Sequence, residues 1–396
     1  MHRIRCLNVR HVVVTLVWVS IACVAALSDS SPSNAQSTRC SSAFLIDTTL
    51  ANGARWSLCW EERANEGIVL NDVHYTPPGN RPSRLIFHQI GLAEIHVPYD
   101  EGSPRFFDVS EFGLGGDGLL DLATGDCPEG TLRQNTTGKD ALCQTITDEG
   151  YAYKFYDIQK QATALTLFSV SAIGNYNYIV QWKFHDDGTA EPSVGATGRL
   201  QQCTTDPRYG WPLGSACNRG TSHMHNFWWR IDMDLNGAAN DRFEEIEFDG
   251  SGTNTREMSV TSHSTETKRR VSPTAFRSWR VMDTATTNGD NHNISYELIP
   301  QSSHVFRGPS SEPWTANDIY LTQFNPCEQL LTHNPTTGGC ADNVTQFATT
   351  QSVSDVVLWY GTSFHHLTRD EDEPYISTHW SGFQIVPRDM TATNPR

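Results

Sequence analysis

Apolar and polar residues alternate in short runs from Cys40 to the C-terminus, and Gly, Pro, Asn and Asp separate these runs. Alternation with a period of two, rich in aromatic and β-branched residues, predicts β-strands. Residues 163–170 also favour a strand over a helix, and residues 185–188 predict the turn of a hairpin. The pattern predicts one all-β domain over residues 40–396, a large antiparallel β-sandwich with long loops. The clearest runs span residues 84–88, 178–184, 227–234 and 355–360.

The first 39 residues differ from the rest of the chain. Three arginines among the first ten residues precede an apolar run from Val12 to Leu27, and a Val-Ala-Ala sequence ends at Ala26. This order is typical of a secretory signal peptide, residues 1–26, followed by a flexible polar leader, residues 27–39. A membrane anchor is the alternative, but the run is short for a spanning helix. We expect a chain that is free of the membrane after cleavage and is secreted, or periplasmic in a bacterium.

Charge and cysteine content narrow the classes of function. The formal net charge of −16 argues against a nucleic-acid partner, because phosphates need Lys and Arg. A negative field suits cationic substrates, although a solvated acidic surface explains the charge equally well.

Eight of the ten cysteines follow the predicted signal peptide, and an even number in an exported chain indicates disulfides. Among about 100 pairings, their order favours Cys40–Cys59, Cys127–Cys143, Cys203–Cys217 and Cys327–Cys340.

His223 and His225 flank Met224 in one predicted strand. Residues two apart on a strand face the same side, so the two imidazoles would converge on one point. Such a pair suits copper or zinc, but many pairs of this kind are ordinary surface residues. A third ligand has to come from elsewhere, and His365 and His366, just after the predicted strand at 355–360, are the candidates.

Three further segments hold side chains suited to chemistry. Asp232 and Asp234 share a strand face, and their oxygens suit calcium unless both acids are simply solvated. Asp108 follows two phenylalanines, where burial would raise its pKa and suit it to general-base work. A lone Asp in a loop is, however, more often a cap or turn residue. Tyr176 and Tyr178 lie in an aromatic segment whose default role is core packing.

Four separated groups of residues resemble the copper amine oxidase family. In chain order they resemble its catalytic-base stretch, its Asn-Tyr-Asp/Glu-Tyr cofactor motif, its copper strand with a neighbouring metal site, and its tail with a third histidine. The joint order is more specific than any one group, and the resemblance runs from about Trp56 to the C-terminus. The groups are residues 97–99 with 107–115, 173–178, 223–225 with 230–237, and 366–374.

The resemblance implies catalytic roles for five residues. Tyr176, with Asn175 before it in the motif, would be the precursor of topaquinone, a quinone cofactor that the chain makes from itself. Asp108 would be the catalytic base, and Tyr99 would hydrogen-bond the quinone oxygen. Phe106 would stand at the substrate gate. The fold implied is the large β-sandwich of the family's catalytic domain.

The resemblance also implies two metal sites. Copper(II) would be bound by His223, His225 and His366. A peripheral calcium-type site would use the side chains of Asp232, Asp234 and Asp355 with the carbonyls of Met233 and Val356.

The implied activity is oxidative deamination of a primary amine by O2, which yields an aldehyde, ammonia and hydrogen peroxide. The family forms homodimers, so a second copy of this chain is the expected partner. Two alternatives remain: a copper-binding protein without catalysis, and an oxidase of lysine side chains in proteins or peptides. Asn177, Thr368 and Glu373 depart from the family pattern, most notably Asn177, where an acid is usual beside the cofactor. Family members also carry N-terminal domains for which this chain has no room.

Overall fold

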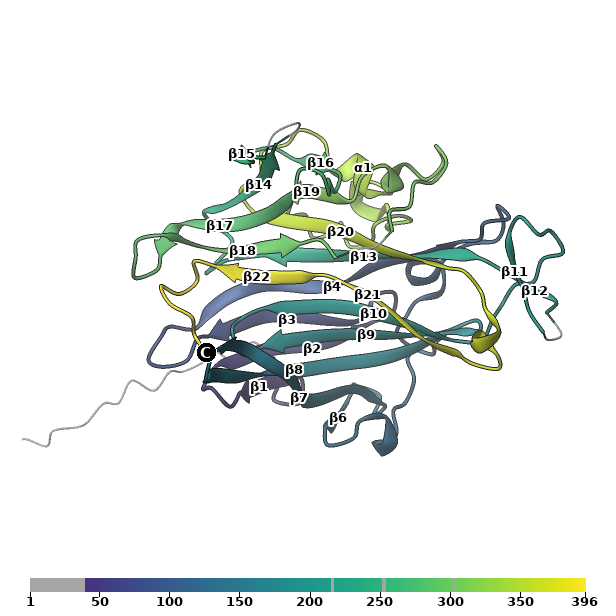
Figure 1. The fold of residues 1–396 in the computed structure, drawn as a ribbon, viewed down its shortest axis with the longest axis horizontal. Coiled ribbons are helices and arrows are strands. Elements are labelled where there is room, and N and C mark those ends of the chain that lie inside the picture. Colours follow the sequence, from purple (N-terminus) through teal and green to yellow (C-terminus); the bar gives the residue numbers. More distant parts are fainter. Residues whose placement is uncertain (1–39, 215–216, 251–253, 302–303) are drawn as a thin grey trace, which may run out of the picture. The chain divides into compact units, whose positions relative to one another are not determined.

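Two large antiparallel sheets dominate the fold, and in Figure 1 the axes of most of their strands lie roughly in the same direction across the view. The computed structural model describes residues 40–214, 217–250, 254–301 and 304–396. The predicted signal peptide, residues 1–26, and the predicted leader, residues 27–39, lie outside the described residues. Alternating apolar patterns thus became strands as predicted, and the all-β, antiparallel class is confirmed.

The first sheet has nine strands among the described residues and contains β13, which is buried along its whole length. In spatial order the strands are β1 (Leu45–Thr49), β2 (Arg55–Arg63), β3 (Gly67–Thr76), β4 (Arg84–Pro98), β13 (His223–Met233), β20 (Val356–His366), β19 (Ile319–Gln323) and β16 (Thr267–Arg269), with β5 (Arg105–Phe107) paired to β4.

The second sheet has eleven strands among the described residues, and a small two-stranded sheet joins β11 (Gly210–Pro212) to β12 (Arg219–Thr221). In spatial order the large sheet holds β15 (Glu257–His263), β14 (Asp241–Asp249), β17 (Ser278–Thr287), β18 (Asn293–Ile299), β22 (Gln384–Arg388), β10 (Ala190–Gly198), β9 (Tyr176–His185), β8 (Ile158–Ile173), β7 (Asp140–Phe155) and β6 (Thr131–Gln134), with β21 (Ile376–Gly382) paired to β10.

Aromatic side chains from the two sheets meet in one core. Trp182 of β9 lies edge to face with Trp229 of β13, and their ring centroids are 6.0 Å apart. The ring centroids of Trp56 of β2 and Phe184 of β9 are 4.8 Å apart. Buried and half-buried residues alternate strictly along β9, as a strand with one face toward a core requires. The two sheets therefore pack as a sandwich, which brings β9 and β13 within side-chain contact.

Helical segments are short among the described residues, and loops carry much of the remaining chain. Among these residues, no helix combines the length and apolar character that a membrane crossing requires. The helical segments are η1 (Asp108–Phe112), η2 (Thr124–Asp126), η3 (Pro313–Ala316), η4 (Thr337–Gly339), α1 (Val344–Phe347) and η5 (Asp370–Asp372).

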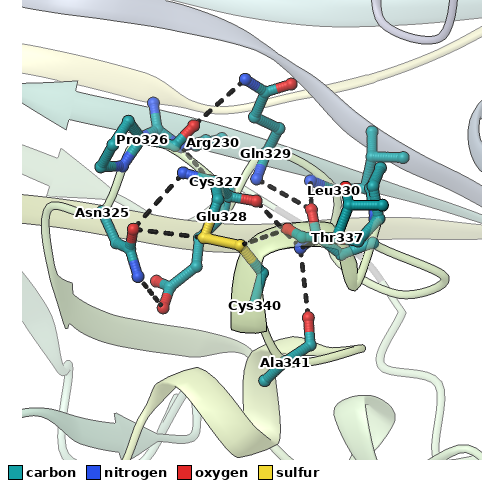
Figure 2. Close-up of a disulfide and its surroundings, with 12 residues drawn as sticks. Arg230, Asn325, Pro326, Cys327, Glu328, Gln329, Leu330, Thr337, Cys340 and Ala341 are labelled. Carbon is teal, nitrogen blue, oxygen red and sulfur yellow. Dashed lines mark hydrogen bonds between the residues drawn. A yellow bond between two sulfur atoms is a disulfide. The ribbon is translucent and has the colours of Figure 1, made fainter.

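The structure contains four disulfides in the sequential pairing that the cysteine order favours: Cys40–Cys59, Cys127–Cys143, Cys203–Cys217 and Cys327–Cys340. Figure 2 shows the last of these in a loop that packs beside β13. Arg230 of β13 donates from Nε to the carbonyl of Glu328 at 2.9 Å, next to the disulfide (Figure 2). The disulfide therefore stabilises a loop that contacts the middle of β13 through the hydrogen bond from Arg230.

One predicted boundary was wrong. The apolar pattern ended the last long strand at residue 360 and left the two candidate histidines beyond it, whereas β20 continues to His366. The pairing of β20 with β13 continues through this polar end, from Gly361 opposite Trp228 to His366 opposite His223. Backbone pairing with a neighbour, which the apolar pattern does not report, keeps the segment extended. The predicted turn at residues 185–188 is confirmed between β9 and β10.

Candidate copper centre and its cavity

Strand register brings three histidines together. His223 at the start of β13 pairs directly with His366 at the end of β20, and His225 follows on the same face as His223. The three side chains are buried, and their ligand atoms all lie within 4.8 Å of one another. His365, the other candidate, points elsewhere, because its Nε2 lies 2.7 Å from Asp100 Oδ2.

Hydrogen bonds fix which nitrogen each ring turns toward the centre of the cluster. His223 Nδ1 lies 3.1 Å from the carbonyl of Thr221, which can only accept, so Nδ1 carries the proton. His366 Nε2 lies 2.9 Å from Asp372 Oδ2, and it is therefore the protonated nitrogen of that ring. The free lone pairs are then on His223 Nε2 and His366 Nδ1, and both face the cluster.

These imidazoles fit a metal ion better than they fit one another. His223 Nε2 and His225 Nε2 are 3.1 Å apart, and a hydrogen bond between them would still leave His225 Nδ1 buried without a partner among the described residues. Burial lowers the pKa of His223 to about 3 and also holds the pKa of His225 well below its usual range, so both rings are neutral. Three buried imidazoles at one point suit a copper ion.

Tyr176 is the fourth group at this point. Its hydroxyl oxygen lies 2.9 Å from His223 Nε2 and 3.3 Å from His366 Nδ1, and its side chain is buried. Tyr176 begins β9 directly after a two-residue turn from β8, in which Gly174 has φ +57°. A first turn residue with positive φ favours glycine, so this turn sets where the tyrosine ring enters the core.

Asp108 lies in the same cavity as Tyr176. It begins η1, is buried, and accepts a 2.6 Å hydrogen bond at Oδ2 from the Tyr178 hydroxyl. Burial raises the pKa of Asp108 to about 7, and the hydrogen bond from Tyr178 partly opposes that rise. A carboxyl group that is half ionised near neutral pH can accept or release a proton under ordinary conditions.

The cavity has a volume of about 190 Å³ and aromatic walls. Tyr99 stacks on His223 with ring centroids 4.5 Å apart, and Phe106 meets Tyr99 edge to face at 6.2 Å. The full lining is Val97, Tyr99, Phe106, Asp108, Phe112, Ile173, Gly174, Tyr176, Tyr178 and Gln201. The structure thus brings together all three histidines, the tyrosine, the aspartate and the two aromatic residues that the sequence singled out.

Two residues of the cofactor motif lie outside this cavity lining. Asn175 is exposed at the hairpin turn and donates from Nδ2 to the carbonyl of Leu200 at 3.1 Å. Asn177 pairs with Ala172 and Thr197, on the face of β9 opposite to Tyr176 and Tyr178. Asn177 in place of the usual acidic residue therefore takes a charge away from the opposite face of β9. The wall of the cavity is unchanged.

Comparison with known proteins agrees with this geometry. The family model described as "Copper amine oxidase, enzyme domain" matches residues 46–396, which is most of the chain. This chain belongs to the copper amine oxidase family. The resemblance carried by the four sequence motifs is thereby confirmed.

Relatives of this chain include the primary amine oxidase of Arthrobacter sp. (strain P1), 25% identical, with 89% of this chain and 60% of that protein aligned. The peroxisomal copper-containing diamine oxidase 1 of Nicotiana tabacum is 26% identical over 89% of this chain and 51% of its own length. The chain thus spans three fifths or less of these curated relatives.

Solved structures share the fold. The copper-containing benzylamine oxidase of Hansenula polymorpha superposes with a TM-score of 0.73 at 18% identity, covering 88% of this chain and 61% of that one. The lysyl oxidase of Pichia pastoris gives a TM-score of 0.71 at 21% identity, covering 86% of this chain and 52% of the other. At this identity the likeness establishes the architecture of the copper amine oxidase domain.

A second cluster in this chain consists of three carboxylates. Asp232, Asp234 and Asp355 place their ligand oxygens within 4.8 Å of one another. In each, Oδ1 is buried without a hydrogen-bond partner among the described residues. Burial, the largest cause, raises the pKa of Asp232 to about 6 and that of Asp234 to about 7. Met233 and Val356, whose carbonyls the resemblance assigns to the site, are paired across β13 and β20.

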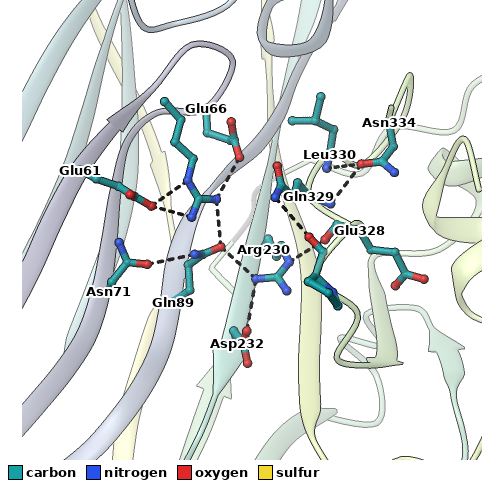
Figure 3. Close-up of polar contacts among 12 residues, drawn as sticks. Glu61, Glu66, Asn71, Gln89, Arg230, Asp232, Glu328, Gln329, Leu330 and Asn334 are labelled. Atoms are coloured by element: carbon teal, nitrogen blue, oxygen red, sulfur yellow. Dashed lines mark hydrogen bonds and ion pairs between the residues drawn. The ribbon is translucent and has the colours of Figure 1, made fainter. Parts of the chain in front are cut away.

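Arg230 balances part of this charge. Figure 3 shows its guanidinium between Gln89 and Asp232, and Nη1 donates to Gln89 Oε1 at 3.1 Å and to Asp232 Oδ2 at 3.4 Å. Arg230 is buried, so its cation is held by these contacts and by the Glu328 carbonyl. Asp232 therefore offers its other oxygen, Oδ1, to the carboxylate cluster.

Sequence reasoning missed three supporting residues. Asp372 fixes His366, and Tyr178 holds Asp108. Glu94 is fully buried and accepts at Oε1 from the Val109 amide at 3.0 Å and at Oε2 from Ser110 Oγ, so it anchors the turn that carries Asp108. Tyr178 and Asp372 lie inside the motifs that resemble the family, but only the fold shows what they contact.

Proposed function

We propose that the chain oxidises primary amines with O2, using copper held by His223, His225 and His366 and a quinone made from Tyr176. The observation that carries the proposal is the position of the Tyr176 hydroxyl, 2.9 Å from His223 Nε2 and 3.3 Å from His366 Nδ1. Copper next to the ring of Tyr176, and the quinone formed there, would supply the electron sink for converting amine, O2 and water into aldehyde, ammonia and hydrogen peroxide.

The chain's own residues supply binding and proton transfer. Asp108 accepts the proton from the carbon that bears the amine, because its raised pKa, about 7, makes the carboxylate a usable base near neutral pH. The Tyr178 hydroxyl occupies Asp108 Oδ2 and leaves Oδ1 for the substrate. Tyr99 lines the same cavity and orients the group made from Tyr176, while Phe106 limits access beside it.

We also propose a Ca²⁺ ion at the Asp232, Asp234 and Asp355 cluster. Three buried carboxylate oxygens without hydrogen-bond partners among the described residues support it, since calcium prefers oxygen ligands.

We also propose that two copies of this chain form a homodimer and that the chain is secreted. Light scattering of the purified protein and detection of the chain outside the producing cell test these two points.

The deciding experiment is a visible absorption spectrum of copper-loaded, aerated protein before and after phenylhydrazine. We expect a broad quinone band that becomes an intense adduct band, and both should be absent from Tyr176→Phe. The rate of hydrogen peroxide release on adding amine should be proportional to the amount of phenylhydrazine adduct that the same preparation forms. Tyr151→Phe, on the exposed part of β7, is the matched control and should keep the band. A colourless protein that still binds copper tightly would support the alternative, a copper-binding protein without catalysis.

A further inference from the structure

The amine cavity contains one charged residue among the described residues that line it. Asp108 is that residue, and the remaining walls are formed mainly by the side chains of Val97, Phe106, Phe112 and Ile173 and by tyrosine rings. We propose that the site takes a primary monoamine with a compact, uncharged apolar tail, an aromatic methylamine or a branched alkylamine, in preference to diamines and peptidyl lysine. The inference rests on the proposed amine oxidase activity and specifies its substrate class.

Cavity size supports a compact tail. Its volume of about 190 Å³ lies below the roughly 300–1,000 Å³ that sites for drug-sized molecules occupy. Two walls are also braced against movement, because Phe106 contacts Tyr99 at 6.2 Å and Phe112 at 6.3 Å, both edge to face. A single six-membered ring between such rings can make the tilted contacts that aromatic pairs favour.

Phe112 shows where the tail would lie. Its side chain is 58% exposed although it lines the cavity, so one face of the ring meets water when no amine is bound. An apolar tail that covers this face removes apolar surface from water, which favours binding.

Charge argues against a diamine. Asp108 must accept a proton from the reacting end, so it is not free to hold a second ammonium group. That group would lie against Val97 or Ile173, where losing water without a polar partner is costly, or beside Gln201, whose amide carries no charge to balance it. Glu111 is the nearest alternative in sequence, but its side chain is exposed and does not line the cavity.

The test separates substrate choice from cofactor formation. Binding of benzylamine and of 1,5-diaminopentane to Tyr176→Phe is measured by titration calorimetry, which needs no quinone, and the same amines and a lysine-containing peptide are then compared by kcat/KM in the copper-loaded enzyme. We expect benzylamine to be favoured in both measurements by about tenfold or more, the discrimination that one mismatched group gives in a pocket. Absence of a quinone band would overturn the proposed amine oxidase function but not this inference about the substrate. The binding preference measured by calorimetry does not depend on the quinone.

Variants locate the selectivity. Phe112→Ala should raise KM for benzylamine roughly three- to tenfold and leave the amount of phenylhydrazine adduct unchanged. Phe155→Ala is the control, because Phe155 is also a largely exposed phenylalanine, at 65%, but pairs with Ile158, at the end of β8 opposite to Ile173. Equal or tighter binding of 1,5-diaminopentane would overturn the inference. Loss of that diamine binding in Glu111→Gln would then identify Glu111 as the partner of the second ammonium group.

Discussion

The Tyr178 hydroxyl donates a 2.6 Å hydrogen bond to Asp108 Oδ2, and both side chains are buried. Tyr178 is two residues from Tyr176 on β9, whereas Asp108 lies on η1, far away in sequence. The bond therefore ties the proposed base to the strand that carries the proposed quinone precursor. It also favours the ionised form of Asp108, against the burial that raises its pKa to about 7.

Tyr178→Phe removes this hydrogen bond and keeps the ring. Because the bond lowers the pKa of Asp108, its loss should raise that pKa above about 7. Only the carboxylate accepts a proton, so the rising limb of kcat/KM against pH should move upward by about one pH unit. Activity near pH 9 should stay close to that of the parent. Tyr151→Phe should not move the limb, and a downward shift in Tyr178→Phe would refute the assignment of Asp108 as base.

The strands and two of the three metal-facing histidines could be predicted because their signals are local. Alternation along β9 and β13 is visible in the sequence, and His223 and His225 share a face by spacing alone. The third ligand was a choice between His365 and His366 until the family motif was considered. Register decides it physically, since His366 pairs with His223 while Met224 pairs with His365.

Support for the site could not be predicted, because it depends on how separate elements fold against one another. Glu94 precedes Val109 by 15 residues, and only the pairing of β4 with β5 turns its carboxylate toward η1. Asp372 reaches His366 because the chain folds back after β20. Periodicity carries no information about such contacts, since each depends on how two elements pack.

Asp372→Ala should weaken copper binding. The Asp372 carboxylate accepts from His366 Nε2 at 2.9 Å, which keeps Nδ1 free and correctly oriented for the metal. Loss of such a partner typically costs about 10- to 100-fold in metal affinity. Competition with a chromophoric chelator measures the change. Asp370→Ala removes an exposed carboxylate from the same short turn, η5, and should bind copper normally. Equal affinity in both variants would contradict the role of Asp372.

Glu94→Ala should destabilise the fold and misplace Asp108. The carboxylate accepts from the amides of Val109 and Ser110 and from the Ser110 hydroxyl, and these donors would be left buried without their partner. We expect the free energy of unfolding to fall by about 3 kcal/mol, measured by urea denaturation. Glu94→Gln keeps one acceptor oxygen and should lose less. Glu101→Ala, at an exposed position, should change stability little, and similar losses in both alanine variants would reject the anchor role of Glu94.

The carboxylate cluster should make calcium stabilise the protein in a pH-dependent way. Burial raises the pKa of Asp232 to about 6 and of Asp234 to about 7, above the ordinary value of 3.8. The folded state of metal-free protein then binds more protons than the unfolded state between about pH 4 and pH 7, so its stability falls as pH rises through that range.

Added Ca²⁺ replaces those protons, so the gain in Tm on adding CaCl2 should be largest near pH 8 and should shrink toward pH 5. Asp108 titrates in the same range, but it is present with and without calcium and cancels from the difference. Asp234→Asn removes one of the charges that a cation would neutralise, and it should lose most of the gain at pH 8. An equal gain at pH 5 and pH 8, or an undiminished gain in Asp234→Asn, would mean that calcium acts elsewhere on the protein.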